Sequence, residues 1–289
     1  MKCDLHVHTT ASGMCNIPFF ERICRECYND PGVLYELLKR RGMDFVTATD
    51  HDSIDAVEPL RRHRDFFLSE EVTCHTPSGT ELHMGVYGIR ESDHVQLQRR
   101  RKDLPALVSY LNERKLFFSI NHVFSSLTGP RTDSDFAFFE EFFPGMEVLN
   151  GAMLETSNRA AAELARRWQK APVAGSDAHT LHSLGRTYTE VPNARSVEEF
   201  VTGLSSGHGV AHGVSGTYSK LTLAVMEIGW SMVREKNWTA LMAPLFLAVP
   251  FVILANAVRE HTFTGKWVRR LQVTEQTAAT PVYCASVSR

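Results

Sequence analysis

Side chains that bind transition metals recur at short intervals through the first two thirds of this 289-residue chain. His6 and His8 lie two residues apart, so in a strand both imidazoles point to the same face and can reach one metal ion. The others lie at or just after the ends of short apolar segments: His51, Glu71, His83, His122, Asp177 and His179. A lone histidine is more often a packed or surface residue than a ligand. Six histidines at the ends of expected strands, where α/β folds collect their active sites, favour one multinuclear metal site.

Such a ligand set has a definite chemical use. Imidazoles with a few carboxylates suit Zn, Mn or Fe better than Mg or Ca, which prefer oxygen ligands. Two or three such ions held close together supply a nucleophilic hydroxide near neutral pH, neutralise the phosphoryl oxygens and assist the leaving oxygen. The sequence therefore predicts hydrolysis of a phosphate mono- or diester through a metal-bound hydroxide, with two or three divalent ions as cofactors.

Three residues are expected to take part directly in this chemistry. Glu71 is the candidate for the carboxylate that bridges two cations, and Asp177 is a ligand whose replacement by Asn should abolish hydrolysis. Arg186 follows the last ligand segment and is suited to hold a substrate phosphate through two parallel hydrogen bonds, with a surface role as the alternative. Three more carboxylates beside the ligands are expected to orient them: Asp4, Asp50 and Asp52.

The elements that must position these residues are short strands alternating with helices. Apolar segments predict strands at 2–8, 43–49, 66–73, 82–88, 116–121, 145–150 and 172–176. Good helix formers lie between several of them, as at 32–41 and 156–170. This alternation favours an α/β fold with parallel strands joined by right-handed crossovers. Seven strands are enough for a barrel, and a doubly wound sheet is the alternative.

Composition limits the class of protein further. The chain is 43% hydrophobic and 22% charged, which allows a large buried core. Its net charge of −2 gives no electrostatic footprint for duplex nucleic acid. Six cysteines in a chain of this length do not indicate a disulfide framework. The N-terminus lacks the charged and apolar regions of a signal peptide, so we expect a cytoplasmic location.

The character of the sequence changes after a segment rich in Gly and Ser at 203–218, which is interpreted as a loop or domain boundary. Residues 238–258 carry no charge and are long enough to cross a bilayer, although Pro244 and Pro250 interrupt them. The alternatives are membrane association, spanning or interfacial, and helices packed on the first domain or in a dimer interface. The basic residues that follow would conflict with a single span from a cytoplasmic domain, which favours an interfacial or re-entrant segment.

The predicted organisation is therefore a metal-site domain, a hydrophobic helical appendage that contacts a membrane in one interpretation, and a flexible tail. Their ranges are 1–216, 217–272 and 273–289.

Three segments carry a family resemblance. Asp4–Thr9, Thr49–Asp52 and Ser176–His179 resemble the signature segments of the PHP (polymerase and histidinol phosphatase) family, and the spacing of Glu71, His83 and His122 fits as well. The resemblance covers residues 1 to about 200. It implies a distorted (β/α)7, TIM-like barrel with a trinuclear site at the carboxyl ends of its strands.

The resemblance also implies how the ligands are shared. His6, His8, Glu71 and Asp177 would hold one ion; Glu71 would bridge to a second with His83 and His122; and His51 and His179 would belong to a third. Members with a full third site usually carry Asp or His where Gly13 and Met14 stand here. Cys15 is either a replacement ligand or an ordinary loop residue, so two ions and three ions both remain open.

Two further functions compete with phosphate-ester hydrolysis. One is hydrolysis of a different bond, such as an amide, at the same site. The other is a membrane-tethered metal-binding or regulatory module without turnover, for which Gly13 is the supporting feature. For the primary hypothesis the substrate would be a phosphorylated small molecule, a nucleotide or a lipid-linked phosphate. The sequence leaves the substrate, the metal and the oligomeric state open.

Overall fold

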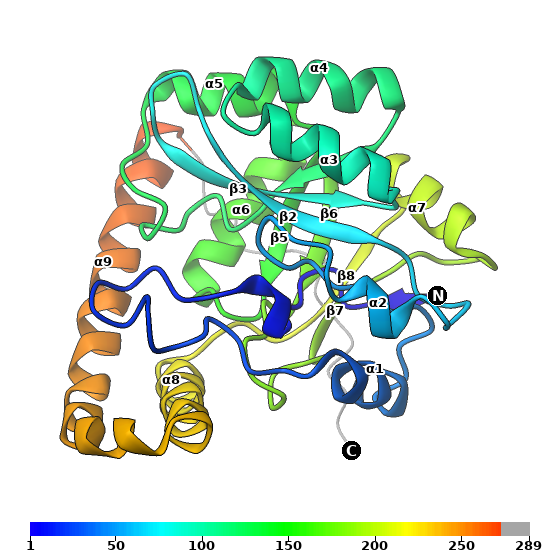
Figure 1. Ribbon diagram of the computed structural model, residues 1–289. Helices are drawn as coiled ribbons and strands as arrows, with labels where there is room; N and C mark the ends of the chain where they lie inside the picture. Colours follow the sequence, from blue (N-terminus) through cyan, green and yellow to red (C-terminus); the bar gives the residue numbers. More distant parts are fainter. Residues whose placement is uncertain (273–289) are drawn as a thin grey trace.

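Two β-sheets form the centre of the structure, which is a computed structural model describing residues 1–272 (Figure 1). The larger sheet has the order β2-β3-β4-β5-β6, and the smaller has the order β1-β7-β8. The strands of the larger sheet are β2 (Ser69–His75), β3 (Glu81–Tyr87), β4 (Phe117–Ile120), β5 (Gly145–Asn150) and β6 (Ala171–Gly175). Those of the smaller sheet are β1 (Lys2–Cys3), β7 (Thr187–Glu190) and β8 (Val210–Gly213).

Helices surround these sheets, and α3, α4 and α5 lie together across one side of the larger sheet (Figure 1). The helices before β6 are α1 (Pro31–Arg40), α2 (Val57–Leu60), α3 (Glu91–Arg100), α4 (Leu104–Arg114), α5 (Asp133–Phe142) and α6 (Glu155–Arg167), with the 3-10 helix η1 (Thr10–Ser12). Those after it are α7 (Val197–Ser205), α8 (Tyr218–Glu235), the 3-10 helix η2 (Asn237–Ala248) and α9 (Val249–Arg270). The helices predicted at 32–41 and 156–170 correspond to α1 and α6.

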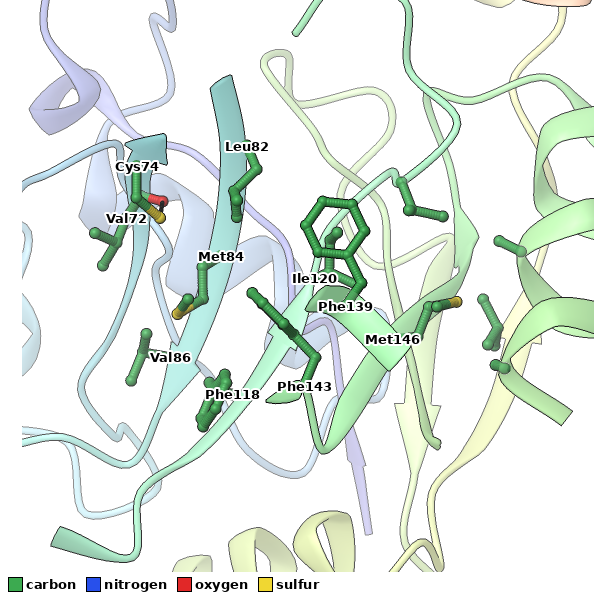
Figure 2. Close-up of a cluster of buried hydrophobic side chains, with 14 of the residues drawn as sticks. Val72, Cys74, Leu82, Met84, Val86, Phe118, Ile120, Phe139, Phe143 and Met146 are labelled. Atoms are coloured by element: carbon green, nitrogen blue, oxygen red, sulfur yellow. Dashed lines mark hydrogen bonds between the residues drawn. The ribbon is translucent and has the colours of Figure 1, made fainter. Parts of the chain in front are cut away.

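Alternation along β2 and β3 separates the core from the polar site. Val72 and Leu82 are fully buried in the main hydrophobic cluster. Figure 2 shows part of this cluster, in which side chains such as Phe139 lie beside the strands. Neighbouring side chains on a strand point to opposite faces. Glu71 and His83, each next to one of these apolar residues, therefore face away from the cluster. The local pattern of the sequence thus directs the ligand-type side chains to one face.

The predicted barrel is wrong in its closure, although the α/β class is right. Within residues 1–272, no continuous ladder joins the two edges of the larger sheet. The segments predicted as strands at 2–8 and 43–49 lie between those edges and pair mainly through the isolated bridges Val7–Ala178, Val46–Phe66 and His51–Glu71. Side chains take some of the backbone amides there: Val7 N donates to Thr49 Oγ1 (2.9 Å) and Thr9 N to Asp50 Oδ1 (2.6 Å). Local side-chain hydrogen bonds of this kind compete with a strand ladder.

The expectation of parallel strands holds for only part of the larger sheet. β4, β5 and β6 are parallel, but β3 is antiparallel to both β2 and β4. The antiparallel pairing of β2 and β3 follows from the short connection at 76–80, which is a hairpin turn with Gly79 at φ +85°. Parallel neighbours need a crossover of a dozen or more residues.

The segment at 203–218, predicted as a loop or domain boundary, contains the end of α7 and the strand β8, which pairs with β7. Neither β7 nor β8 was among the predicted strands. Each has only four residues, which leaves little periodicity to detect. The predicted tail at 273–289 lies outside the described residues.

The C-terminal segment is helical, and its exposure to solvent differs along its length: one part packs on the domain and another part does not. The carboxyl half of α9 packs on the domain: Trp267 is 1% exposed and its ring lies 4.6 Å from that of Phe136. Glu260 accepts hydrogen bonds from Ser126 N and Oγ (2.9 and 2.8 Å). Residues 237–270 are long and apolar enough to cross a membrane, with a mean hydropathy of 2.2 in the most apolar window, and none of that window is buried.

Candidate metal centre

The structure brings all eight ligand-type residues together at one end of the strands. Glu71 and His83 lie on β2 and β3, and His122 follows β4 by two residues. Asp177 and His179 follow β6. The remaining three come from the irregular segments that lie between the sheet edges: His6, His8 and His51. They form overlapping groups whose ligand atoms lie within 4.8 Å of one another.

Glu71 stands at the centre of this cluster and is fully buried. Three histidine nitrogens surround its Oε1: His6 Nε2 (3.3 Å), His122 Nε2 (3.4 Å) and His83 Nδ1 (3.6 Å). Two surround its Oε2: His51 Nδ1 (3.3 Å) and His8 Nε2 (3.6 Å). Each oxygen therefore faces a different set of imidazoles, as a carboxylate that bridges two cations must. Glu70, its neighbour, points the other way and accepts from Gln98 Nε2 (2.9 Å).

Asp177 completes a four-residue group with His6, His8 and Glu71. Its Oδ1 lies 3.6 Å from His6 Nε2 and 3.4 Å from His8 Nε2. Two ligands about 2.1 Å from a tetrahedral ion are about 3.4 Å apart. The distances within the group therefore match the edges of a metal coordination shell.

Buried polar atoms in the cluster provide a separate test of whether metal ions fit. His6 Nε2, His8 Nε2, His83 Nδ1 and Glu71 Oε2 are buried and have no hydrogen-bond partner. Buried polar groups in proteins are nearly always satisfied, and each exception needs an explanation. These four atoms all belong to the expected ligand set and face one another. Divalent ions therefore fit the residues present.

The charges of the cluster are strongly coupled. Burial opposes ionisation of Glu71, but His6, His51 and His83 outweigh it and hold the pKa of that carboxyl well below its usual value. Burial and the neighbouring His179 lower the pKa of His8 to about 3, so this imidazole is neutral, as a ligand must be. His6 shows the opposite: despite its burial, Glu71 and Asp177 raise its pKa well above the usual value. The carboxylates thus create a negative potential that favours a cation.

Glu147 on β5 fixes several of these ligands and was missed in the sequence. Its Oε1 lies 2.8 Å from His6 Nδ1, and its Oε2 accepts from His122 N (2.8 Å) and Asn150 Nδ2 (2.9 Å). Asn150 Nδ2 also donates to Asp177 Oδ2 (3.0 Å). A carboxylate on the far nitrogen of a ligand histidine sets its tautomer and orientation. The available signal was a lone acid within an apolar strand.

Glu147→Gln is expected to weaken metal binding about tenfold or more while leaving the fold intact, because the amide loses the charge that holds His6. Metal titration by calorimetry measures the change. Glu140→Gln, at an exposed position on α5, is the control and should bind metal normally. Equal affinity for both variants would contradict the orienting role.

The three aspartates predicted to orient ligands lie at different distances from them. Asp50 accepts from Ser12 Oγ (2.7 Å), which in turn lies 3.1 Å from His8 Nδ1. Asp4 accepts from the backbone N of Ser176 and Gly185, and burial raises the pKa of its carboxyl to about 6. Asp52 contacts Arg101 and Thr73 N, outside the cluster.

Two ligand residues have unusual backbone conformations. Asp177 and His122 have φ values of +50° and +28°, in a region that residues other than glycine rarely adopt. Hydrogen bonds hold both: Asp177 N donates to His6 O (2.7 Å), and His122 N donates to Glu147. Local strain that is held by surrounding contacts is typical of functional sites.

A carboxylate that the sequence did not indicate stands beside the expected third position. Glu26 Oε1 lies 3.4 Å from His51 Nε2 and 3.8 Å from His179 Nε2. Although burial opposes it, hydrogen bonds from His179 and His51 lower the pKa of Glu26 below its usual value. Cys15, the alternative ligand, instead packs with Cys24 and Met232. Of the two interpretations of Cys15, the structure therefore favours the ordinary loop residue.

Two cations lie near each other, and one of them, Lys220, is close enough to Asp177 to feel its charge. Arg186 is exposed, in the turn after Gly185. Lys220 on α8 is partly buried, and its Nζ donates to Gly151 O (2.6 Å), directly after β5. Burial and the charge of Arg186 lower the pKa of Lys220, while Asp4 and Asp177 act to raise it. Lys220 was missed because it lies beyond the predicted domain boundary.

Comparisons with known proteins agree with this picture. A family model described as PHP-associated matches residues 155–208, and no curated protein matches the chain. PsfC from Pseudomonas syringae PB-5123 is 16% identical, with a TM-score of 0.55 over 80% of this chain and 97% of that one. The lesion-specific endonuclease PfuEndoQ from Pyrococcus furiosus is also 16% identical, with a TM-score of 0.50 over 74% of this chain and 59% of that one. At such identities, the likeness to these two structures establishes a shared fold.

The match and the site point to one family. The matched residues begin at α6 and include the segment with Asp177 and His179. The other two segments that resemble the family's signatures supply His6, His8 and His51 to the same cluster. The match over residues 155–208, together with the residues of the site, supports a relationship of this chain to the PHP domain family.

Proposed function

We propose that this protein is a metal-dependent hydrolase that cleaves phosphate mono- or diesters. The observation that carries the proposal is the position of Glu71, whose two oxygens face five imidazole nitrogens, several of them buried without a hydrogen-bond partner. When bound, the metal ions would supply Lewis acidity and an activated water. The nearby cations Arg186 and Lys220 favour an anionic substrate group over a neutral bond such as an amide.

Each residue of the site would have a separate role in metal or substrate binding. One ion would be held by His6, His8, Asp177 and Glu71. A second would be held by Glu71 together with His83 and His122. A third position would be held by His51, His179 and Glu26. Arg186 and Lys220 would orient the phosphate, and Glu147 would keep His6 in the required tautomer.

Lys220→Ala is expected to raise KM for a phosphate ester about tenfold with a smaller change in kcat, because the ammonium would bind the substrate phosphate in both ground and transition states. Lys220→Arg should recover most of the loss, since the charge is kept. Steady-state kinetics and competition by inorganic phosphate measure the effect. A loss in kcat alone, with unchanged inhibition by phosphate, would contradict the role.

A phosphatase screen over nucleotides, sugar phosphates and isoprenoid phosphates, with Mn and with Zn, tests the proposed function. We expect metal-dependent release of phosphate from at least one class, and its loss in Asp177→Asn. A parallel screen with amide substrates separates the two kinds of hydrolase. Metal binding without turnover on any substrate would instead support a binding or regulatory module.

A further inference from the structure

An apolar surface extends over two segments that are far apart in the sequence. These segments are residues 13–23 and residues 237–258, and together they are called the apolar surface below. Its most exposed large side chains are Phe19 (89%), Leu241 (86%), Leu247 (77%) and Phe251 (73%). Single exposed apolar residues are ordinary, but a continuous group of this kind marks a site of interaction.

Contacts at the edges of the two segments hold the N-terminal loop against α8 and η2. Lys236 Nζ donates to Ile23 O (3.1 Å), and Arg25 pairs with Glu235 (2.8 Å). Phe20, Ile23 and Tyr28 pack against side chains of α8 and η2, including the buried Met232. Figure 1 shows the N-terminal loop, in dark blue, near α8, with which it packs. The loop and η2 therefore share an apolar contact around Phe20, Ile23 and Phe246.

The helices are folded back rather than extended as a span. Tyr218 Oη donates to Pro250 O (3.1 Å), and Phe246 lies against Gly229, so η2 and the start of α9 run back along α8. Beyond residue 258, α9 is anchored in the domain by Glu260 and Trp267. The exposed part of α9, residues 249–258, is about 15 Å long, half of the roughly 30 Å hydrocarbon core. In this arrangement the exposed part of α9 is by itself too short to cross a bilayer.

The chemistry of the surface indicates a lipid interface. Residues 237–258 carry no charged side chain. Trp230 and Trp238 are each 57% exposed, and the cations Arg234 and Lys236 lie between them in the sequence. Tryptophan and basic residues beside an uncharged helical face are typical of segments that lie in the headgroup region. Phe19, held outward at φ +70°, adds an aromatic side chain in a backbone conformation that such residues rarely adopt.

We propose that the apolar surface binds the interface of a phospholipid bilayer, with η2 and the start of α9 lying among the headgroups and Phe19 inserted beside them. The loop that carries Phe19 also carries Glu26 to His51 and His179, so the contact places the metal centre next to the membrane surface. This inference goes beyond the proposed hydrolysis and does not depend on it.

Flotation of the full chain with phosphatidylcholine vesicles, alone or with a minor fraction of phosphatidylglycerol, tests the inference. The wild-type protein should float with vesicles, and the emission of Trp230 and Trp238 should shift to the blue. Leu241→Glu should lower the bound fraction at least about tenfold, because a charge is costly among apolar lipid groups. Phe19→Glu, at a solvent-exposed loop position that is less critical for folding, should weaken binding in the same direction.

Val95→Glu, at a 45% exposed position on α3, is the matched control and should float like the wild type. Wild-type protein that stays at the bottom of the gradient would overturn the inference. So would a dimer in light scattering that Leu241→Glu converts to monomers without any vesicle binding, because the surface would then be a contact between copies. Either result leaves the phosphatase screen unaffected, so the two proposals fail separately.

Discussion

Glu71→Gln is expected to reduce metal-dependent hydrolysis more than about 1,000-fold, equivalent to about 4 kcal/mol of transition-state stabilisation. The physical reason is that one carboxylate serves five imidazoles. Its replacement by an amide removes the negative charge on which two cation positions depend and leaves His6 and His51 without their principal counter-charge. Kinetics and elemental analysis of the same preparations measure the loss of turnover and of metal.

Glu70→Gln provides the matched control for this experiment. Glu70 is adjacent, equally buried and on the same strand, but its side chain contacts His94 and Gln98 on the other face. The control variant should keep its metal ions and most of its activity. If Glu70→Gln and Glu71→Gln lose activity equally, the loss reflects damage to β2, and the central role of Glu71 is contradicted.

Glu26→Gln is expected to lower the metal content by one equivalent and activity by about 100-fold, because Glu26 is the carboxylate that joins His51 and His179. The ions held around Glu71 should remain, since their ligands do not include Glu26. Elemental analysis before and after dialysis against a weak chelator measures the difference.

Glu21→Gln is the control for this second experiment, because Glu21 lies on the same loop and is exposed. It should behave as the wild type. An unchanged metal content in Glu26→Gln would show that the third position is either not used or completed by other residues. A loss of all metal would contradict the separation of this position from the pair centred on Glu71.

Short-range spacing carried most of the information about the site. His6 and His8 share a face because they are two apart, and Glu71 faces the site because Val72 and Leu82 face the core. Asp177 and His179 follow a buried strand that ends at the expected edge. Each of these inferences needs only the local conformation, which the sequence pattern specifies well.

The residues that sequence reasoning missed reach the site through long-range packing. Glu26 lies on an irregular loop that is held by contacts with α8, some 200 residues away, and no periodicity points to it. The position of the Lys220 side chain beside the site depends on how α8 packs against the domain. Glu147 is on a predicted strand, but its role depends on the neighbour it faces. The sequence could not predict whether the barrel closes. Closure depends on whether backbone amides donate to carbonyl groups of a neighbouring strand or to side chains such as Asp50.

The most direct test of a multinuclear hydrolytic centre is a metal titration of the stripped protein. Mn or Zn is added stepwise while hydrolysis of an aryl phosphate and the bound metal are followed together. The structure predicts activity that rises with occupancy and reaches its plateau at no fewer than two equivalents, since Glu71 faces two separate sets of imidazoles. Full activity with one equivalent, or turnover that is indifferent to metal, would contradict the account.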